Sequence, residues 1–313
     1  MTFETWWATL FISVEFLLQL LVVTRVIMRG ARRSATSLAW IVVVLFLPIA
    51  GMVAWFLIGE ARIGSRRRRR YAELAERIVT FAKSLGPMED HRSDPPGYEV
   101  AIALAEAVGG TPPRGGHTLE LMGDTKQVID SLVVDIDAAQ ETCNLLFYIY
   151  LDDGSGRQVA QALKGAARRG VQCRLLVDDV GSKKFLKSRL CESLREAGVR
   201  VVGALPAHLL RAAFARIDLR NHRKLAIIDG VIGYTGSQNI ADASFAPKPM
   251  FAPWVDCMLR IQGPVVWDLQ TIFVCDWFLD TGEPIESLLT KDTGEVDDGV
   301  TVQILPTGPA NDN

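Results

Sequence analysis

Twenty-one consecutive residues near the amino terminus, Leu38–Ile58, carry no charged side chain. As an α-helix rising ~1.5 Å per residue they would reach about 31 Å, enough to cross the ~30 Å hydrocarbon core of a bilayer. Pro48 and Gly51 interrupt the run, which a membrane helix tolerates better than a soluble one does. The run therefore predicts a membrane-spanning helix, with a buried core helix as the alternative.

A second apolar stretch, Trp6–Ile27, lies just before this run. It contains Glu15 and Gln19, which are four residues apart and so share one face of a helix that could pack on the other span. We therefore predict a transmembrane helical hairpin over residues 1–60, with spans at about 6–27 and 38–58. An interfacial helix is the alternative for the first stretch.

The charge balance changes along the chain. Through Arg70 there are 10 basic and 3 acidic residues, or +7, and from Tyr71 onward there are 24 basic and 33 acidic residues, or −9. A basic membrane module thus precedes a mildly acidic globular part. Because the globular part is acidic and lacks interleaved basic and aromatic residues, we expect no nucleic acid partner.

Arginines flank both apolar stretches. Four lie at residues 25–33, beside the loop between the predicted spans, and six lie at residues 62–70, beyond the second span. This excess favours a globular domain in the cytoplasm and a multi-pass protein of the inner or plasma membrane. The last five are a stop-transfer flank, a surface for anionic lipid headgroups at ~1 kcal/mol each, or both; they are Arg66, Arg67, Arg68, Arg69 and Arg70.

The rest of the chain alternates between strand and helix patterns. Residues 61–117 comprise the basic flank, a predicted helix at 71–83 and turn-rich linkers, and residues 118–290 form the alternating region. The predicted strands are 118–122, 142–150, 172–177, 199–204, 225–229, 231–235 and 255–261, and the predicted helices are 126–139, 156–169, 183–197 and 265–279. This alternation predicts an α/β domain with a mixed sheet flanked by helices.

Residues 291–313 contain one more strand signal, at 300–305. Its sequence is similar to residues 119–124, which open the alternating region, so we expect a second repeat that begins here and is cut short.

The chemistry-bearing residues are concentrated between 218 and 242. His222 and Lys224 are two apart at a strand entrance, so their side chains share one face. Asp229 is seven residues from His222, an odd separation, and on a straight strand it faces the other side. It is then structural, or it acts after a bend.

A second cluster of donors follows the next apolar run. Gly236 gives a backbone that can approach an anion closely, and Ser237 and Asn239 add a hydroxyl and an amide. With the imidazole as nucleophile or acid–base group, and with the ammonium and neutral donors on developing charge, the set suits a phosphate group. The five cysteines have no zinc-ligand spacing, and the usual metal-binding carboxylate clusters are absent, so no metal or cofactor is expected.

These residues spell H-x-K-x4-D-x6-G-S-x-N, which resembles the HKD motif of the phospholipase D superfamily. The apolar run at 38–58, the lead-in Arg220-Asn221 and the segment Trp254-Val255-Asp256 resemble the bacterial cardiolipin synthase branch. The resemblance implies a phospholipase D-like mixed sheet flanked by helices, without a cofactor. It implies catalytic roles for His222, Lys224 and Asp229, and phosphate binding by Lys224, Gly236, Ser237 and Asn239.

The resemblance also implies a two-step phosphatidyl transfer. One histidine attacks the phosphodiester to form a phosphohistidine, a second protonates the leaving glycerol, and phosphatidylglycerol as acceptor would give cardiolipin. Alternatives are a phospholipase D-type hydrolase and an inactive or lipid-binding half-enzyme. The superfamily uses two HKD motifs and this chain has one. A missing carboxy-terminal part or a second copy in a homodimer would supply the other, unless the chain is an inactive remnant.

Overall fold

The computed structural model describes residues 3–29, 34–59, 91–206, 220–245, 250, 252–290, 293–294 and 296–306, with short pieces between 69 and 81. The chain divides into two compact units. One comprises residues 1–64 with 208–219, and the other comprises residues 65–207 with 220–313.

The amino-terminal unit is helical. Its elements are α1 (Phe3–Arg29), α2 (Ser34–Phe46), α3 (Pro48–Ala54) and a π-helix, η1 (Trp55–Gly59). Among the residues that the structure describes, one helical stretch, Trp6–Met28 in α1, is long and apolar enough to cross a membrane. The apolar part of α2 is shorter, Ala35–Phe46.

The prediction of one continuous span over 38–58 is wrong. The helix ends at Phe46, Leu47 leaves helical geometry (φ −127°, ψ 71°), and α3 starts at Pro48. A proline clashes with a helical residue before it and has no N–H to give, which explains the break. After the break α3 turns back along α2. A Cβ on Gly51 would lie 2.6 Å from the carbonyl oxygen of Val43, so only glycine permits this approach.

The carboxy-terminal unit is built on one eight-stranded sheet in the order β4-β3-β2-β5-β6-β7-β1-β8. Strands β2, β3 and β4 run parallel to one another, and all other neighbours are antiparallel, which confirms the predicted mixed sheet. The strands are β1 (Arg114–Met122), β2 (Thr142–Phe147), β3 (Gln172–Asp178), β4 (Arg200–Ala204), β5 (Leu225–Ile228), β6 (Ile232–Gly236), β7 (Met258–Gln262) and β8 (Val300–Val302).

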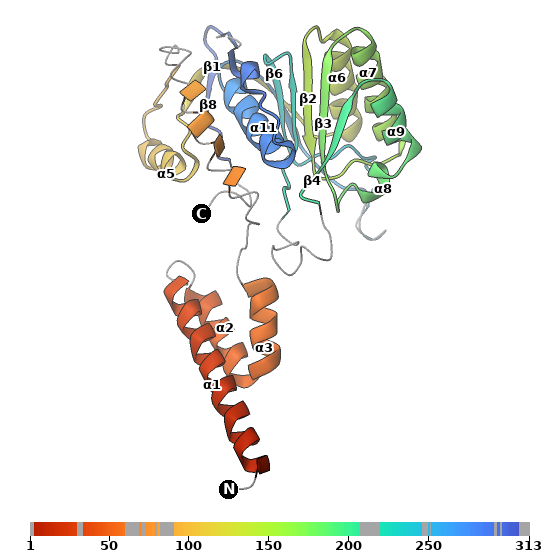
Figure 1. Cartoon of the computed structure of the whole chain (residues 1–313). Coiled ribbons are helices and arrows are strands. Elements are labelled where there is room, and N and C mark those ends of the chain that lie inside the picture. The colour runs from red at the N-terminus through yellow and green to blue at the C-terminus, as the bar shows by residue number, and fades with distance from the viewer. Residues whose placement is uncertain are drawn as a thin grey trace. The chain divides into compact units, whose positions relative to one another are not determined.

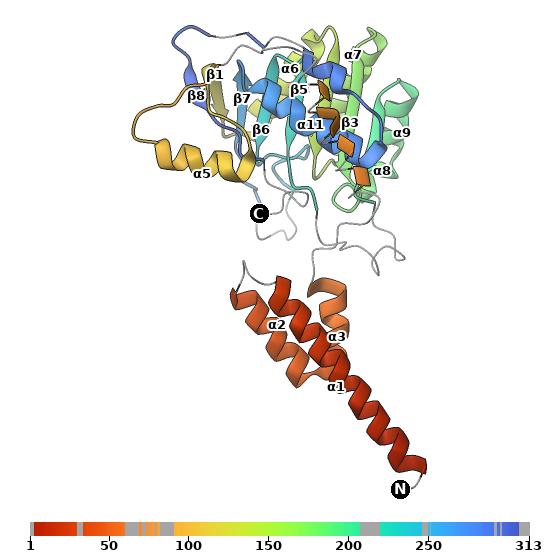
Figure 2. The same ribbon diagram turned by 60° about the vertical axis from the view of Figure 1, so that its left-hand side comes forward.

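Helices cover both faces of this sheet (Figures 1 and 2). One face carries α6 (Thr125–Ala138), α7 (Gly154–Arg168) and α9 (Arg189–Glu196), and the other carries α11 (Val266–Thr281). Successive residues of β2 alternate between the two cores: Leu145 packs with the first set, and Leu146 packs with α11. Burial on both faces explains why β2 reads as an unbroken apolar run.

Two local features differ from the prediction. The helix predicted at 183–197 is divided into α8 (Lys183–Leu186) and α9, because Ser188 caps a new helix by accepting the N–H of Cys191. Helix α5 (Glu99–Gly109) was not predicted. Strand β8 lies within the strand predicted at 300–305 and pairs with β1 at the edge of the same sheet, and the second repeat that was expected to begin there stays a prediction.

Candidate active site

The segment that leads into β5 alternates between side chains that are anchored in the protein and side chains that line a cavity. Asn221, 4% exposed, donates to Asp276 Oδ2 at 2.8 Å, and Arg223 forms an ion pair with the same carboxylate at 2.6 Å. His222 and Lys224 alternate with these anchors and line a cavity instead. The shared face expected from the two-residue spacing is therefore present.

Arg220 ties this segment to the end of β3. Its guanidinium and the carboxylate of Asp178 form a buried ion pair at 2.7 Å. Asp178 also accepts the N–H groups of Val180 and Gly181, at 2.9 and 2.8 Å. Two neighbouring strand ends are thus held in register beside His222.

His222 and Lys224 stand between two cavities. One has a volume of about 370 Å³ and the other about 420 Å³, and both residues line both. The first cavity is lined by Tyr148, Ile149, Ser237, Gln238, Asn239, Ala241, Asp242, Ala243, Phe245, Trp254 and Asp256, besides the shared pair. Of the residues lining the two cavities, His222 is the one histidine.

Ser237 and Asn239 are fixed at the first cavity by backbone N–H groups just before β7 and just after β2. The hydroxyl of Ser237 accepts the N–H of Cys257 at 3.0 Å. Asn239 Oδ1 accepts the N–H of Ile149 at 3.0 Å, which leaves the amide NH2 group as the donor for a ligand. The structure thus brings both predicted donors together with His222 and Lys224.

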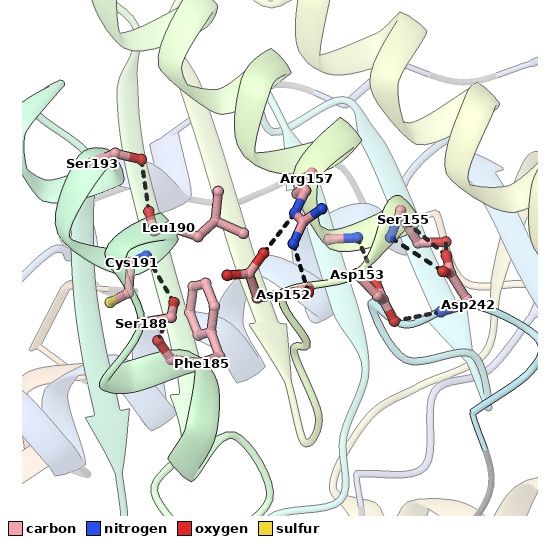
Figure 3. A network of polar contacts seen from close by, with 12 residues as sticks. Asp152, Asp153, Ser155, Arg157, Phe185, Ser188, Leu190, Cys191, Ser193 and Asp242 are labelled. Atoms are coloured by element: carbon pink, nitrogen blue, oxygen red, sulfur yellow. Dashed lines mark hydrogen bonds and ion pairs between the residues drawn. The ribbon is translucent and has the colours of Figure 1, made fainter.

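The segment that carries Asn239 is tied to the first turn of α7 (Figure 3). The carboxylate of Asp242 accepts the N–H groups of Gly154 and Ser155 and the hydroxyl of Ser155, at 3.1, 2.7 and 2.6 Å. In return, Asp153 caps α7 at Gly156 and accepts the N–H of Asp242 at 2.9 Å. These reciprocal bonds hold the donor loop against a rigid helix.

Asp229 lies away from this group of residues. It occupies the turn between β5 and β6 with a positive φ of 51°, and its carboxylate accepts the N–H groups of Gln140, Glu141 and Thr142 at 2.7–2.8 Å. It thereby fastens the start of β2, so the expected catalytic role is replaced by a structural one. The odd spacing from His222 already favoured this outcome.

Two other expected ligand-binding residues have structural roles. A Cβ on Gly236 would lie 2.3 Å from the carbonyl oxygen of Cys257, so this glycine permits the close approach of β7. Arg70, expected to bind lipid, donates to the carbonyl oxygens of Leu279 and Thr281 at the end of α11, at 2.9 and 3.1 Å. Arg69 is exposed, and Arg66, Arg67 and Arg68 lie outside the described residues.

The comparisons with known proteins identify the family of the domain that carries this site. Residues 132–275 match the family described as "Cardiolipin synthase, PLD-like domain", and residues 17–60 match "Phospholipase_D-nuclease N-terminal". Cardiolipin synthase A of Erwinia tasmaniensis is 36% identical over 98% of this chain and 64% of its own length. The chain carries a PLD-like domain of the cardiolipin synthase family.

Other relatives match this chain with a similar identity and over a similar share of their own length. Cardiolipin synthase A of Yersinia pseudotuberculosis is 34% identical over 92% of this chain and 60% of its own length. The chain thus spans less than two thirds of the curated relatives that it matches. Among solved structures, the phospholipase D family member Nuc from Salmonella typhimurium is 16% identical, over 51% of this chain and 94% of its own, with a TM-score of 0.36.

Tyr148 and Asp256 are two further residues of this PLD-like site, and no local pattern in the sequence predicts a role for them. The ring of Tyr148 stacks on the His222 imidazole with centroids 4.0 Å apart and planes 22° apart. Lys224 Nζ lies 5.7 Å from the Tyr148 centroid and donates to the carbonyl oxygen of His222 at 2.6 Å. Tyr148 therefore fixes the ring plane of the histidine and contacts the lysine.

We expect Tyr148→Leu to lower kcat by roughly 10- to 100-fold with little change in KM. Without the stacked ring, the imidazole of His222 is no longer held in the orientation that attack on phosphorus requires. Tyr148→Phe keeps the stack and should retain activity, and Tyr98→Leu, an exposed tyrosine elsewhere, is the matched control. Initial rates of phosphodiester turnover measure the effect. If Phe and Leu are equally harmful at position 148, the hydroxyl and not the stack is what matters.

The charge states of the site favour a neutral imidazole beside a cation. Partial burial, and after it the positive charge of Lys224, lower the pKa of His222 below its ordinary value, while Asp178 opposes this shift. Burial also lowers the pKa of Lys224, and the carboxylate of Asp256 raises it in part. At neutral pH the imidazole is therefore a free base, as a nucleophile requires.

We expect Lys224→Met to raise the pKa of His222 toward its ordinary value, because the largest charge that disfavours the imidazolium is gone while burial remains. The pH dependence of carbethoxylation of the His222 peptide, which follows the neutral imidazole, measures this pKa. The wild-type midpoint should lie below pH ~6.5. Lys183→Met, an exposed lysine on α8, should leave the midpoint in place, and an unchanged midpoint in Lys224→Met would contradict the electrostatic explanation.

Proposed function

We propose that the protein is a membrane-anchored phosphatidyltransferase of cardiolipin synthase type, which transfers a phosphatidyl group from one phosphatidylglycerol to another. The observation that carries the proposal is the convergence of His222, Lys224, Ser237 and Asn239 on one cavity, with the pKa of the imidazole lowered. The cardiolipin synthase relatives support this choice of lipid.

In the first step, a ring nitrogen of His222 attacks the phosphorus of the bound lipid. A P–N bond forms, the P–O bond to the headgroup glycerol breaks, and that glycerol leaves after taking a proton. Lys224, the hydroxyl of Ser237 and the amide of Asn239 donate to the non-bridging oxygens, where charge grows in the transition state. In the second step, a hydroxyl of the acceptor phosphatidylglycerol attacks the phosphorus of the phosphohistidine and loses its proton. A P–O bond to the acceptor forms, the P–N bond breaks, and His222 is restored as the free imidazole.

Among the residues that line the two cavities His222 is the one histidine, so a second histidine to give and take this proton comes from elsewhere. His117 does not serve, because its Nε2 accepts the N–H of Val265 and its Nδ1 contacts the carbonyl oxygen of Val300. A second HKD half supplies the proton donor, either from a carboxy-terminal continuation or from a second copy of the chain. The catalytic domain acts at the cytoplasmic face of the inner or plasma membrane.

Product analysis tests the proposal. Membranes that contain the protein are incubated with phosphatidylglycerol labelled at phosphorus, and the lipids are separated. Cardiolipin with release of one glycerol per transfer is the expected result. Phosphatidic acid as the sole product would instead assign a hydrolase with water as acceptor, and no consumption of lipid would assign a lipid-binding protein.

A further inference from the structure

The break at Leu47 changes how the amino-terminal unit can meet a membrane. Residues 38–58 can cross a bilayer only as one continuous helix of ~31 Å, because shorter helices do not reach across it. In the structure, α3 instead returns along α2. Trp55, which follows α3, is buried in one cluster with Val44, Val22 and Val26, and Trp40 packs against the same cluster.

The depth of the turn follows from a contact with α1. Gln19 donates through Nε2 to the carbonyl oxygen of Val44 at 3.0 Å, so these residues lie at one level. Gln19 precedes Met28, the end of the apolar stretch, by nine residues, or ~14 Å, and Leu47 lies roughly 4 Å deeper. The turn is then ~18 Å from one end of a stretch that measures ~34 Å, which is near its middle.

The return path has a matching length. Pro48–Gly59 is helical over 12 residues, which at ~1.5 Å per residue carries the chain back by about 17 Å. The chain therefore comes back to the level at which α2 began, beside the carboxy-terminal end of α1.

The polar groups at the turn are suited to hydrocarbon. Gln19 satisfies the carbonyl of Val44, one of those that the end of α2 leaves without a helical partner. Leu47 N–H donates to Val43 O, Gly51 N–H donates to Leu47 O, and Pro48 has no N–H to satisfy. The side chains around the turn are apolar and exposed, at 54% for Leu45, 80% for Phe46, 58% for Leu47 and 57% for Ile49. Lipid chains are the environment that covers such a surface.

From this geometry we infer that α2, α3 and η1 form a re-entrant hairpin that occupies one leaflet, and that α1 alone crosses the bilayer. The chain enters and leaves the hairpin on the side where α1 ends. All ten arginines of the first 70 residues then lie on that side, and the segment before Trp6 holds only an acidic residue, Glu4. With a re-entrant hairpin ten arginines lie on one side of the membrane and none on the other, whereas two spans would divide them six to four. The larger difference is a far stronger signal for a cytoplasmic location of that side. Arg25 and Arg29, at the end of α1, then lie at the level of the anionic headgroups of the leaflet that the hairpin enters.

The two topologies differ in where the amino terminus lies. With a re-entrant hairpin the terminus is on the opposite side of the membrane from the residues after Gly59, whereas with two spans it is on the same side. Cys257, which is exposed, marks the side of the catalytic domain, and Thr2→Cys marks the terminus. Sealed membrane vesicles of the full chain are treated with a membrane-impermeant maleimide, and the labelled peptides are assigned by mass spectrometry.

In inverted vesicles we expect at least roughly ten-fold more label on position 257 than on position 2, and the reverse in right-side-out vesicles. Detergent should make both positions react. Label on both positions in the same vesicle orientation would overturn the inference, whether it comes from two spans or from an α1 that lies along the surface. The labelling result does not depend on lipid turnover, so it tests the re-entrant hairpin independently of the proposed function.

A substitution at the turn gives an independent measurement. Gly51→Val places a side chain against the backbone of Val43, and it should open the hairpin and raise trypsin cleavage after the arginines at 62–70 by several-fold. Ala50→Val, at an exposed neighbouring position, is the matched control. Equal cleavage in the two variants would contradict the fold-back of α3.

Discussion

Phosphatidyl transfer should fall by at least about 10³-fold in His222→Gln, since the loss of a nucleophile removes the covalent route altogether. Glutamine keeps a polar side chain of similar length but cannot form the phosphohistidine. Because His222 lines the cavity and belongs to neither hydrophobic core of the sheet, the variant should insert and fold as the wild type does. The initial rate of cardiolipin formation, at equal protein per membrane lipid, measures the effect.

His91→Gln is the control for this substitution, since His91 lies outside both cavities. It should retain wild-type turnover. A His222→Gln protein with activity within a few-fold of the wild type would show that the attack on phosphorus comes from elsewhere.

Asp229→Ala should lower the free energy of unfolding of the catalytic domain by about 2–4 kcal/mol. The substitution leaves three backbone N–H groups without their carboxylate acceptor. It also places an alanine at a positive φ of 51°, where a side chain without a local hydrogen bond is strained. For a domain of this size the loss corresponds to a fall in Tm of roughly 5–15 °C. Thermal unfolding followed by circular dichroism measures it.

Asp229→Asn separates structure from chemistry. Asparagine tolerates the positive φ and keeps one acceptor oxygen, so it should recover a large part of the lost stability. Both variants should keep most of their kcat well below their melting temperatures. If Asp229→Asn melts at the wild-type temperature but has lost turnover, the carboxylate of Asp229 takes part in catalysis.

The sequence predicts the site well where the contributing residues are close along the chain. Strand alternation places His222 and Lys224 on one face, and the odd spacing separates Asp229 from them. The stack of Tyr148 on His222 joins residues 74 positions apart and depends on the pairing of β2 with β5, which no local pattern specifies. For the same reason, a role for Asp256 emerges only when β7 is in place beside β6.

The membrane module shows the opposite limit. An apolar sequence over residues 38–58 is compatible both with a continuous span and with a helix that folds back, because lipid surrounds the side chains in both cases. Pro48 and Gly51 were visible as interruptions, but their effect depends on contacts with Val43 and with Gln19 of α1. Local composition therefore predicts membrane insertion and leaves the path of the chain to tertiary packing.

The covalent intermediate is the most direct test of the proposed mechanism. Membranes that contain the protein are mixed with phosphatidylglycerol and quenched under denaturing alkaline conditions that preserve phosphohistidine, and the digested peptides are analysed by mass spectrometry. We expect the peptide that contains His222 to carry one phosphatidyl group, and the same peptide from His222→Gln to carry none. Turnover without an adduct, or with the adduct on another residue, would contradict the assignment of His222 as the nucleophile.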